Sequence, residues 1–472
     1  MREVNMTTAE NKQEELGYKP ITGLMVRMAV PGIIAQLINI LYSIIDRIYI
    51  GHIPGNGNLA LTGVGVCLPI IMVVSAFSSL VASGGAPKAS IAMGRGDKEE
   101  AERILGSCFS FLFIISLVIS VVLVIWNKPM LLTFGASENT IYYASSYMTI
   151  YASGTLFVQM TLGMNAFITA QGKTTVSMFV VVIGAVLNII LDPIFIFGFG
   201  MGVKGAALAT IISQCVSSIL CIAYISSDKS ILRLKITRLK IVPSLLFSCL
   251  ALGISTFIMQ STESIISVCF NSSLLKYGGD IAVGAMTISA SVMQMGMLPL
   301  QGISQGAQPI SSYSYGKGDK ERVKKCFKYL LLSSFAFSFV LWVLIELFPS
   351  VFASIFSPDP LLVEYASKAL RVYMGATLVF GIQISCQMTF IAVGNAVSSI
   401  IVAVLRKFVL LIPMIYIIPH FFQNKTMGVF AAEPIADFMA VSCTAIIFYF
   451  QFRASLRKID EREKTDIVEN RE

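Results

Sequence analysis

Long apolar stretches, separated by short polar and basic segments, dominate the chain. A helix that crosses a bilayer needs about 20 mostly apolar residues, and twelve stretches reach that length. They lie at about 24–51, 59–86, 104–126, 139–170, 175–198, 202–226, 244–271, 280–312, 326–348, 361–393, 398–419 and 427–453. The pattern predicts an all-α polytopic membrane protein with twelve transmembrane helices.

The composition supports this class and excludes others. Of the 472 residues, 55% are apolar and 13% are charged, and the mean hydropathy is +0.77. A soluble protein carries about 25% charged residues, so an ordinary soluble enzyme is excluded. The nine cysteines occur singly, without the paired spacing of disulfides or metal ligands. We therefore expect no enzyme activity and no metal site of that kind. The net charge of +8 does not indicate a nucleic-acid partner, since the basic residues are concentrated in the loops.

The distribution of Lys and Arg predicts the orientation. Of the 35 basic residues, 28 fall in segments on the same side of the membrane as the N-terminus. This count includes Arg406 and Lys407, which are assigned to one of these segments. Because positive loops stay in the cytoplasm, both termini of this multi-pass protein are expected to be cytoplasmic.

Short motifs repeat along the chain. Residues 94–101 (GRGDKEEA) match residues 316–323 (GKGDKERV) at an offset of 222, and residues 170–172 match 392–394 at the same offset. The GxGD strings resemble those of membrane aspartyl proteases, but they lie among basic loop residues and are interpreted as turns. The repeats predict two pseudo-symmetric six-helix bundles with a cavity between them, which is typical of transporters. The predicted segments are 1–20 (cytoplasmic), 21–226 (first lobe), 227–243 (cytoplasmic linker), 244–453 (second lobe) and 454–472 (cytoplasmic tail).

The first lobe contains two acids within apolar stretches, where ionisable groups are costly and usually functional. Gln36, Asn39, Tyr42 and Asp46 lie on one helix face, downstream of Pro31, which favours a bend. The alternative is that Asp46 pairs with the adjacent Arg47, although neighbouring helix residues point about 100° apart.

The second acid, Asp192, also lies within an apolar stretch. Asn188 and Asp192 are one helical turn apart, and Pro193 weakens the helix beside them. Two carboxylates that converge in a dry site cannot both stay charged cheaply, so Asp46 and Asp192 are candidates for proton binding. A structural helix-breaking turn at 192–193 is the alternative.

The second lobe carries Glu263 and a set of amides and methionines that suit an adaptable ligand cavity. The candidates are Met286, Met293, Gln294, Gln301 and Gln305, with Met295, Met297, Gln308, Gln383 and Gln387 nearby. Amide-mediated helix packing explains each amide equally well. Glu433 and Asp437 are one turn apart at an undecided depth.

Several of these motifs together resemble the multidrug and toxic compound extrusion (MATE) family and its MepA-like bacterial branch. The resemblance covers about residues 20–450. It is carried by YSIIDRIYIG (42–51), NIILDP (188–193), QGISQGAQP (301–309) and AEPIAD (432–437).

The resemblance implies a V-shaped pair of bundles that exports amphiphilic, often cationic drugs in exchange for H⁺ or Na⁺. It implies an ion site at Asp46, Asn188, Asp192 and Thr210, cavity residues at Asn39, Asn165 and Ser213, and a bend of the first helix at Pro31. The acid that Na⁺-coupled NorM-like members add on the tenth helix has no counterpart between Tyr373 and Val393, which favours protons, although Na⁺ at Asp46 and Asp192 stays open. The resemblance to the bacterial branch also implies a place in the bacterial plasma membrane, and we expect a monomer in the lipid bilayer that needs no cofactor.

Two alternatives remain from the sequence. A flippase for lipid-linked precursors has the same fold, but its anionic substrate calls for more cavity arginines than Arg371 and Arg406 provide. A membrane receptor of this fold would bind a ligand without transporting it.

Overall fold

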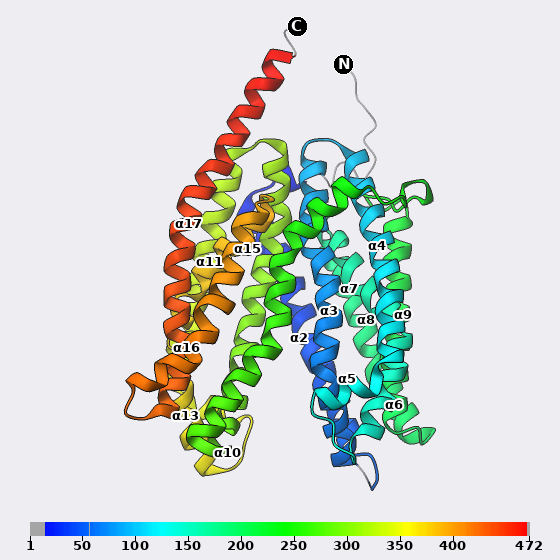
Figure 1. Cartoon of the computed structure of the whole chain (residues 1–472). Helices are drawn as coiled ribbons and strands as arrows, with labels where there is room; N and C mark the ends of the chain where they lie inside the picture. The colour runs from blue at the N-terminus through cyan, green and yellow to red at the C-terminus, as the bar shows by residue number, and fades with distance from the viewer. Residues whose placement is uncertain (1–14, 56, 470–472) are drawn as a thin grey trace. The chain divides into compact units, whose positions relative to one another are not determined.

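The structure, a computed structural model, describes the backbone of residues 15–55 and 57–469 and the side chains up to Glu461. Helices make up the fold of these residues, and no strand occurs among them (Figure 1). The predicted all-α class is confirmed. Of the two predicted terminal segments, residues 1–14 and 470–472 lie outside the described residues.

The chain divides into two compact units. The first contains the described residues up to Lys19 and Val30–Gly253, and the second contains Pro20–Ala29 and the chain from Ile254 onward. The helices of the first half are α2 (Ile21–Gly51), α3 (Gly57–Gly94), α4 (Lys98–Ile125), α5 (Asn127–Thr133), α6 (Ile141–Ser153), α7 (Thr155–Ala170), α8 (Thr174–Pro193), η1 (Ile194–Gly198), α9 (Val203–Ser226) and η2 (Ile236–Arg238).

The second half has the same kind of organisation. Its helices are α10 (Pro243–Lys317), α11 (Lys320–Leu347), α12 (Pro349–Ser354), α13 (Pro360–Tyr373), α14 (Thr377–Ala392), α15 (Ala396–Val404), η3 (Leu405–Leu411), α16 (Ile412–Ile417), η4 (Ile418–Phe421) and α17 (Lys425–Glu469). Because of where the units divide, α2 and α10 each pass from one unit into the other.

The helices account for the predicted spans. Among the described residues, nine helices have the length and hydropathy of a membrane span. One of them, α10, has 75 residues and a non-helical break at Gly279, so it includes two predicted spans. At about 1.5 Å per residue it is far longer than the roughly 30 Å of hydrocarbon that one span crosses. The pair α13 and α14, bent by 50°, and the pair α6 and α7 supply the other two.

The repeated GxGD motif forms the same turn and helix cap in both halves. Gly96 and Gly318 have φ of 82° and 85°, in the left-handed region that glycine tolerates. The following aspartates cap the next helix: Asp97 accepts from Glu100 N at 2.8 Å, and Asp319 accepts from Arg322 N at 2.9 Å. The repeat therefore preserves a helix–turn–helix junction, as the loop interpretation predicted.

Each unit also includes the first residues of the helix that begins the other half of the chain. In each unit this segment packs closely against a glycine of a neighbouring helix. In the first unit, a Cβ on Gly84 of α3 would lie 1.9 Å from the Cys249 carbonyl oxygen of α10. In the second, a Cβ on Gly306 of α10 would lie 2.7 Å from the Ala29 nitrogen of α2. The two glycines are separated by the repeat offset, so both halves require a glycine at this close helix crossing.

This crossing gives a first prediction. Gly84→Ala should destabilise the protein by about 1–3 kcal/mol, because the new methyl group meets backbone that cannot rotate away. The check is the unfolding midpoint in mixed detergent micelles. Gly65→Ala, in the same helix but with nothing within 4 Å of the new Cβ, is the control. It should be neutral or stabilising by up to about 1 kcal/mol, and equal midpoints for both variants would contradict the crossing argument.

Candidate functional site

The first unit brings four predicted polar residues together inside the helices. Asp46 lies on α2, Asn188 and Asp192 on α8, and Thr210 on α9. Asn188 and Asp192 are 2% and 0% exposed. The carboxyl groups of Asp46 and Asp192 are within hydrogen-bonding reach of each other. Residues from three helices therefore form one cluster, in which Asn188 and Asp192 are buried and Asp46 and Thr210 partly buried, and which we call the carboxyl site.

The local structure explains how α8 and α9 present these groups. The Asn188 Nδ2 donates to Asp192 Oδ1 at 3.3 Å, as expected for residues one turn apart, and lies 3.5 Å from Thr210 Oγ1. Thr210 donates its hydroxyl proton to the Ala206 carbonyl at 3.0 Å, so its oxygen faces Asn188 as an acceptor. After Asp192, α8 ends at Pro193 and continues as the π-helical turn η1. Such turns are frequent at functional sites.

The carboxyl site has an excess of acceptors over donors. Asp46 Oδ1, Asn188 Oδ1 and Asp192 Oδ2 are buried and have no hydrogen-bond partner among the described residues. Leaving such oxygens without a partner is costly. Two carboxyl groups, an amide and a hydroxyl are groups that can take up a proton or coordinate a hard cation such as Na⁺.

The side chain of Arg47 is exposed, but its charge acts on the neighbouring Asp46 carboxyl, which also interacts with Asp192.

Tyrosines line one side of the carboxyl site, and the sequence analysis recognised only one of them. Tyr42 and Tyr147 are both close enough to Asp46 for electrostatic interaction. Tyr147 stacks on Tyr151, with ring centroids 6.3 Å apart. Aromatic faces attract organic cations. The sequence feature that points to Tyr147 is the Tyr–Met pair at 147–148, which recurs at 373–374.

The other predicted residues of the first unit lie on the same helices. Gln36, Asn39 and the hinge candidate Pro31 are partly buried on α2, which is helical throughout Ile21–Gly51. Asn165 of α7 donates to the Ser177 carbonyl of α8 at 3.4 Å. Ser213 is buried one turn after Thr210.

In the second unit the predicted cavity residues are distributed between core and surface. Met286 is 6% exposed and belongs to the hydrophobic core of this unit, and Met293 packs against that core. Gln294 and Gln301 are exposed, and Gln305 is partly buried. The neighbouring Gln387 donates to Ser399 Oγ at 2.8 Å, which is the helix-packing role that the sequence left open.

A charged cluster in the second unit was not predicted. Arg406 and Lys407, expected in a cytoplasmic segment, instead lie in η3 and are 4% exposed each. Arg406 Nε contacts Asp437 Oδ1 at 2.7 Å, and its Nη2 lies 3.8 Å from Glu433 Oε1. Lys407 Nζ contacts Glu263 Oε1 at 2.8 Å. Assigning these two cations to a loop was wrong, because acids elsewhere in the sequence compensate their charge inside the helices.

This cluster contains the counterpart of Tyr147. Tyr373 interacts electrostatically with Glu433, Glu263 and Asp437. The repeated tyrosine therefore lies beside ionisable groups in both units, although the groups themselves differ. Glu433 and Asp437, whose depth the sequence could not decide, are 3% and 4% exposed.

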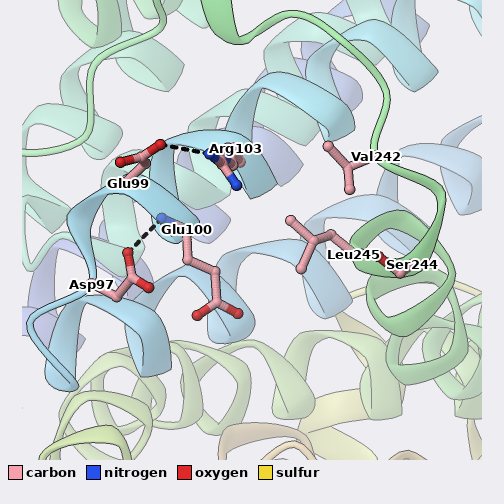
Figure 2. A pocket seen from close by; sticks show the side chains of 7 residues that line it. All are labelled: Asp97, Glu99, Glu100, Arg103, Val242, Ser244 and Leu245. Carbon is pink, nitrogen blue, oxygen red and sulfur yellow. Dashed lines mark hydrogen bonds and ion pairs between the residues drawn. The ribbon is translucent and has the colours of Figure 1, made fainter.

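A surface hollow of about 460 Å³ lies beside the first turn of α4 (Figure 2). It is lined by Asp97, Glu99, Glu100, Arg103, Val242, Ser244 and Leu245. Asp97 caps α4, and Glu99 pairs with Arg103 and with Arg238 of the linker at 2.6 Å each. Of these acids Glu99 holds the linker, and no predicted site residue lines the hollow.

The linker is attached to the first unit at other points as well. Gln171 Oε1 accepts from the backbone nitrogens of Ile231 and Leu232 at 2.8 and 3.1 Å. Lys235 Nζ contacts the buried Glu102 at 2.8 Å. The linker is thus an ordered part of this unit.

Comparisons with known proteins identify relatives over nearly the whole chain. The family model described as MatE matches residues 31–194 and again residues 254–417, in agreement with the internal repeat. The multidrug export protein MepA of Staphylococcus haemolyticus (strain JCSC1435) is 26% identical over 435 residues, covering 91% of this chain and 95% of the relative. MepA of Staphylococcus aureus (strain MRSA252) is 26% identical over 443 residues, covering 93% and 96%.

A solved structure described as MATE in the bent conformation has a TM-score of 0.89 to this chain. It is 21% identical and covers 97% of this chain and all of its own, so the fold is shared.

Proposed function

Because the chain belongs to the MatE family of multidrug efflux transporters, we propose that it is a proton-coupled antiporter that exports amphiphilic, mostly cationic drugs. It works in the bacterial plasma membrane with both termini in the cytoplasm. The orientation is supported by the basic residues, of which 26 remain on the N-terminal side once the buried Arg406 and Lys407 are removed from the 28.

One observation carries the coupling proposal: the contact between the buried carboxyl groups of Asp46 and Asp192. Two carboxylates in contact repel each other unless a proton or a cation lies between them. In the inward-open state the deprotonated site attracts a cationic drug into the cavity, with Tyr42 and Tyr147 as aromatic contacts. After the switch to the outward-open state, a proton enters the carboxyl site and removes negative charge. The drug loses its counter-charge and leaves.

The position of Pro31 supports a bend of α2 as the accompanying movement. A proline inside a helix removes one backbone hydrogen bond and lowers the cost of a kink. The division into units falls between Ala29 and Val30, next to this proline, so α2 changes its packing partners there.

The driving force is sufficient for export. One elementary charge that crosses 100 mV contributes about 2.3 kcal/mol, or roughly 50-fold in concentration. One or two protons per cycle therefore suffice.

The test is transport by the purified full chain in liposomes loaded with ethidium. We expect ethidium to leave the liposomes when a pH gradient is imposed. With a sodium gradient alone it should stay inside. Sodium-driven flux would keep the antiporter but replace the proton by Na⁺ at Asp46 and Asp192. Absence of flux for several cations under both gradients would contradict multidrug export and favour the flippase or the receptor.

A further inference from the structure

The charged cluster of the second unit contains one ion pair that is open to its surroundings on one side. Lys407 Nζ lies 2.8 Å from Glu263 Oε1. The lysine side chain is 5% exposed and the glutamate side chain is 53% exposed. The pair therefore presents a carboxylate at the surface, with its cation supplied from inside the protein.

Glu433 also interacts electrostatically with Lys407, but Glu263 is the acid that the Lys407 ammonium contacts directly, at 2.8 Å. Arg406 is directed to Asp437, at 2.7 Å, and to Glu433, at 3.8 Å, and its guanidinium also lies 4.5 Å from the centre of the Phe380 ring. An ammonium buried without a partner is strongly disfavoured. Lys407 consequently stays on Glu263 unless another group compensates for the loss.

This arrangement changes what Glu263 can do for a ligand. A bare carboxylate would attract any organic cation, whereas this one is already neutralised. A cationic ligand must displace the lysine ammonium from the carboxylate, which reduces the ligand's net gain in binding free energy. Lys407 lies in the π-helical turn η3, which has the α-helices α15 and α16 on its two sides. Such turns are frequent at functional sites.

We propose that Lys407 is a tethered counter-cation that masks Glu263 and thereby sets how strongly the second unit binds organic cations. The inference rests on the proposed function, since it concerns the same cationic substrates. It assigns to Lys407 a role in specificity, separate from the carboxyl site of the first unit.

Binding to the full chain in nanodiscs tests this role. The probe is tetraphenylphosphonium, whose charge does not depend on pH, and the readout is its dissociation constant. Lys407→Met should tighten binding about two- to fivefold, the size of pairing with one partly exposed carboxylate. Lys407→Arg, which keeps the charge, should stay near the original protein. Adding Glu263→Gln to Lys407→Met should abolish the gain. The neutral amphiphile N-phenyl-1-naphthylamine should bind all four proteins alike.

Unchanged or weaker cation binding in Lys407→Met would overturn the inference. A second measurement on the unaltered protein covers the case in which that variant does not fold. Amine labelling of Lys407, followed by mass spectrometry, should increase several-fold when tetraphenylphosphonium is present, because the ligand displaces the ammonium. Equal or lower labelling would contradict the proposal. A different result would contradict the proposed function: that the original protein neither binds nor transports any cation.

Discussion

Asp192→Asn should reduce proton-driven export to the leak of protein-free liposomes and should weaken the binding of cationic drugs, because the neutral amide removes the same negative charge that protonation removes. Asparagine has nearly the shape of aspartate and fits beside Asn188, but it cannot release or accept a proton at neutral pH. Asp46→Asn should have the same effect, because the two carboxyl groups are in contact and act on one proton. For the same reason the double variant should be no worse than either single one, since residues that act as a unit are not additive.

The measurement is ethidium flux in liposomes under an imposed pH gradient, with ethidium binding measured in parallel. Glu138→Gln is the control, because Glu138 is an exposed acid on the loop between α5 and α6. It should transport normally. Full gradient-driven flux in both Asp192→Asn and Asp46→Asn would contradict the assignment of proton coupling to the carboxyl site.

Local sequence patterns predicted much of this site. The spacing of Asn188 and Asp192 determines that they share a helix face, and Pro193 determines that the helix is interrupted beside them. These relations lie within one helical turn, so one stretch of sequence contains them. The contact of Asp46 with Asp192 joins helices far apart in the chain. It was expected only from the burial of two acids and from the family resemblance.

The charged cluster shows where reasoning from hydropathy fails. Lys and Arg usually mark the ends of spans, and Arg406 and Lys407 were assigned accordingly. The structure buries them because Glu433, Asp437 and Glu263 compensate their charge from α17 and α10. Such compensation is a tertiary property, and the spacing within one helix does not reveal it. The repeat does not reveal it either, since no described basic residue of the first unit is buried as Arg406 and Lys407 are.

Arg406→Met should destabilise the second unit by about 3–5 kcal/mol. Removing one partner from a buried ion-pair cluster leaves uncompensated charge in a low dielectric. Here the loss strands Asp437 and Glu433, both nearly inaccessible to solvent, and Glu433 Oε2 already lacks a hydrogen-bond partner among the described residues. The check is the free energy of unfolding from a denaturing-detergent titration in mixed micelles.

Two further variants separate charge from packing in this prediction. Combining Arg406→Met with Glu433→Gln and Asp437→Asn should recover most of the lost stability, because the two carboxylates that Arg406 compensated are removed with it and the remaining charges, Lys407 and Glu263, compensate each other. Arg453→Met is the matched control: this guanidinium also lies over an aromatic ring, 4.1 Å from the centre of Tyr449, but it is exposed. It should cost about 0.5–1 kcal/mol. If Arg406→Met cost no more than Arg453→Met, the buried cluster would contribute no more than a surface contact. If the triple variant were as unstable as Arg406→Met, packing of the arginine, and not its charge, would be what stabilises this part of the unit.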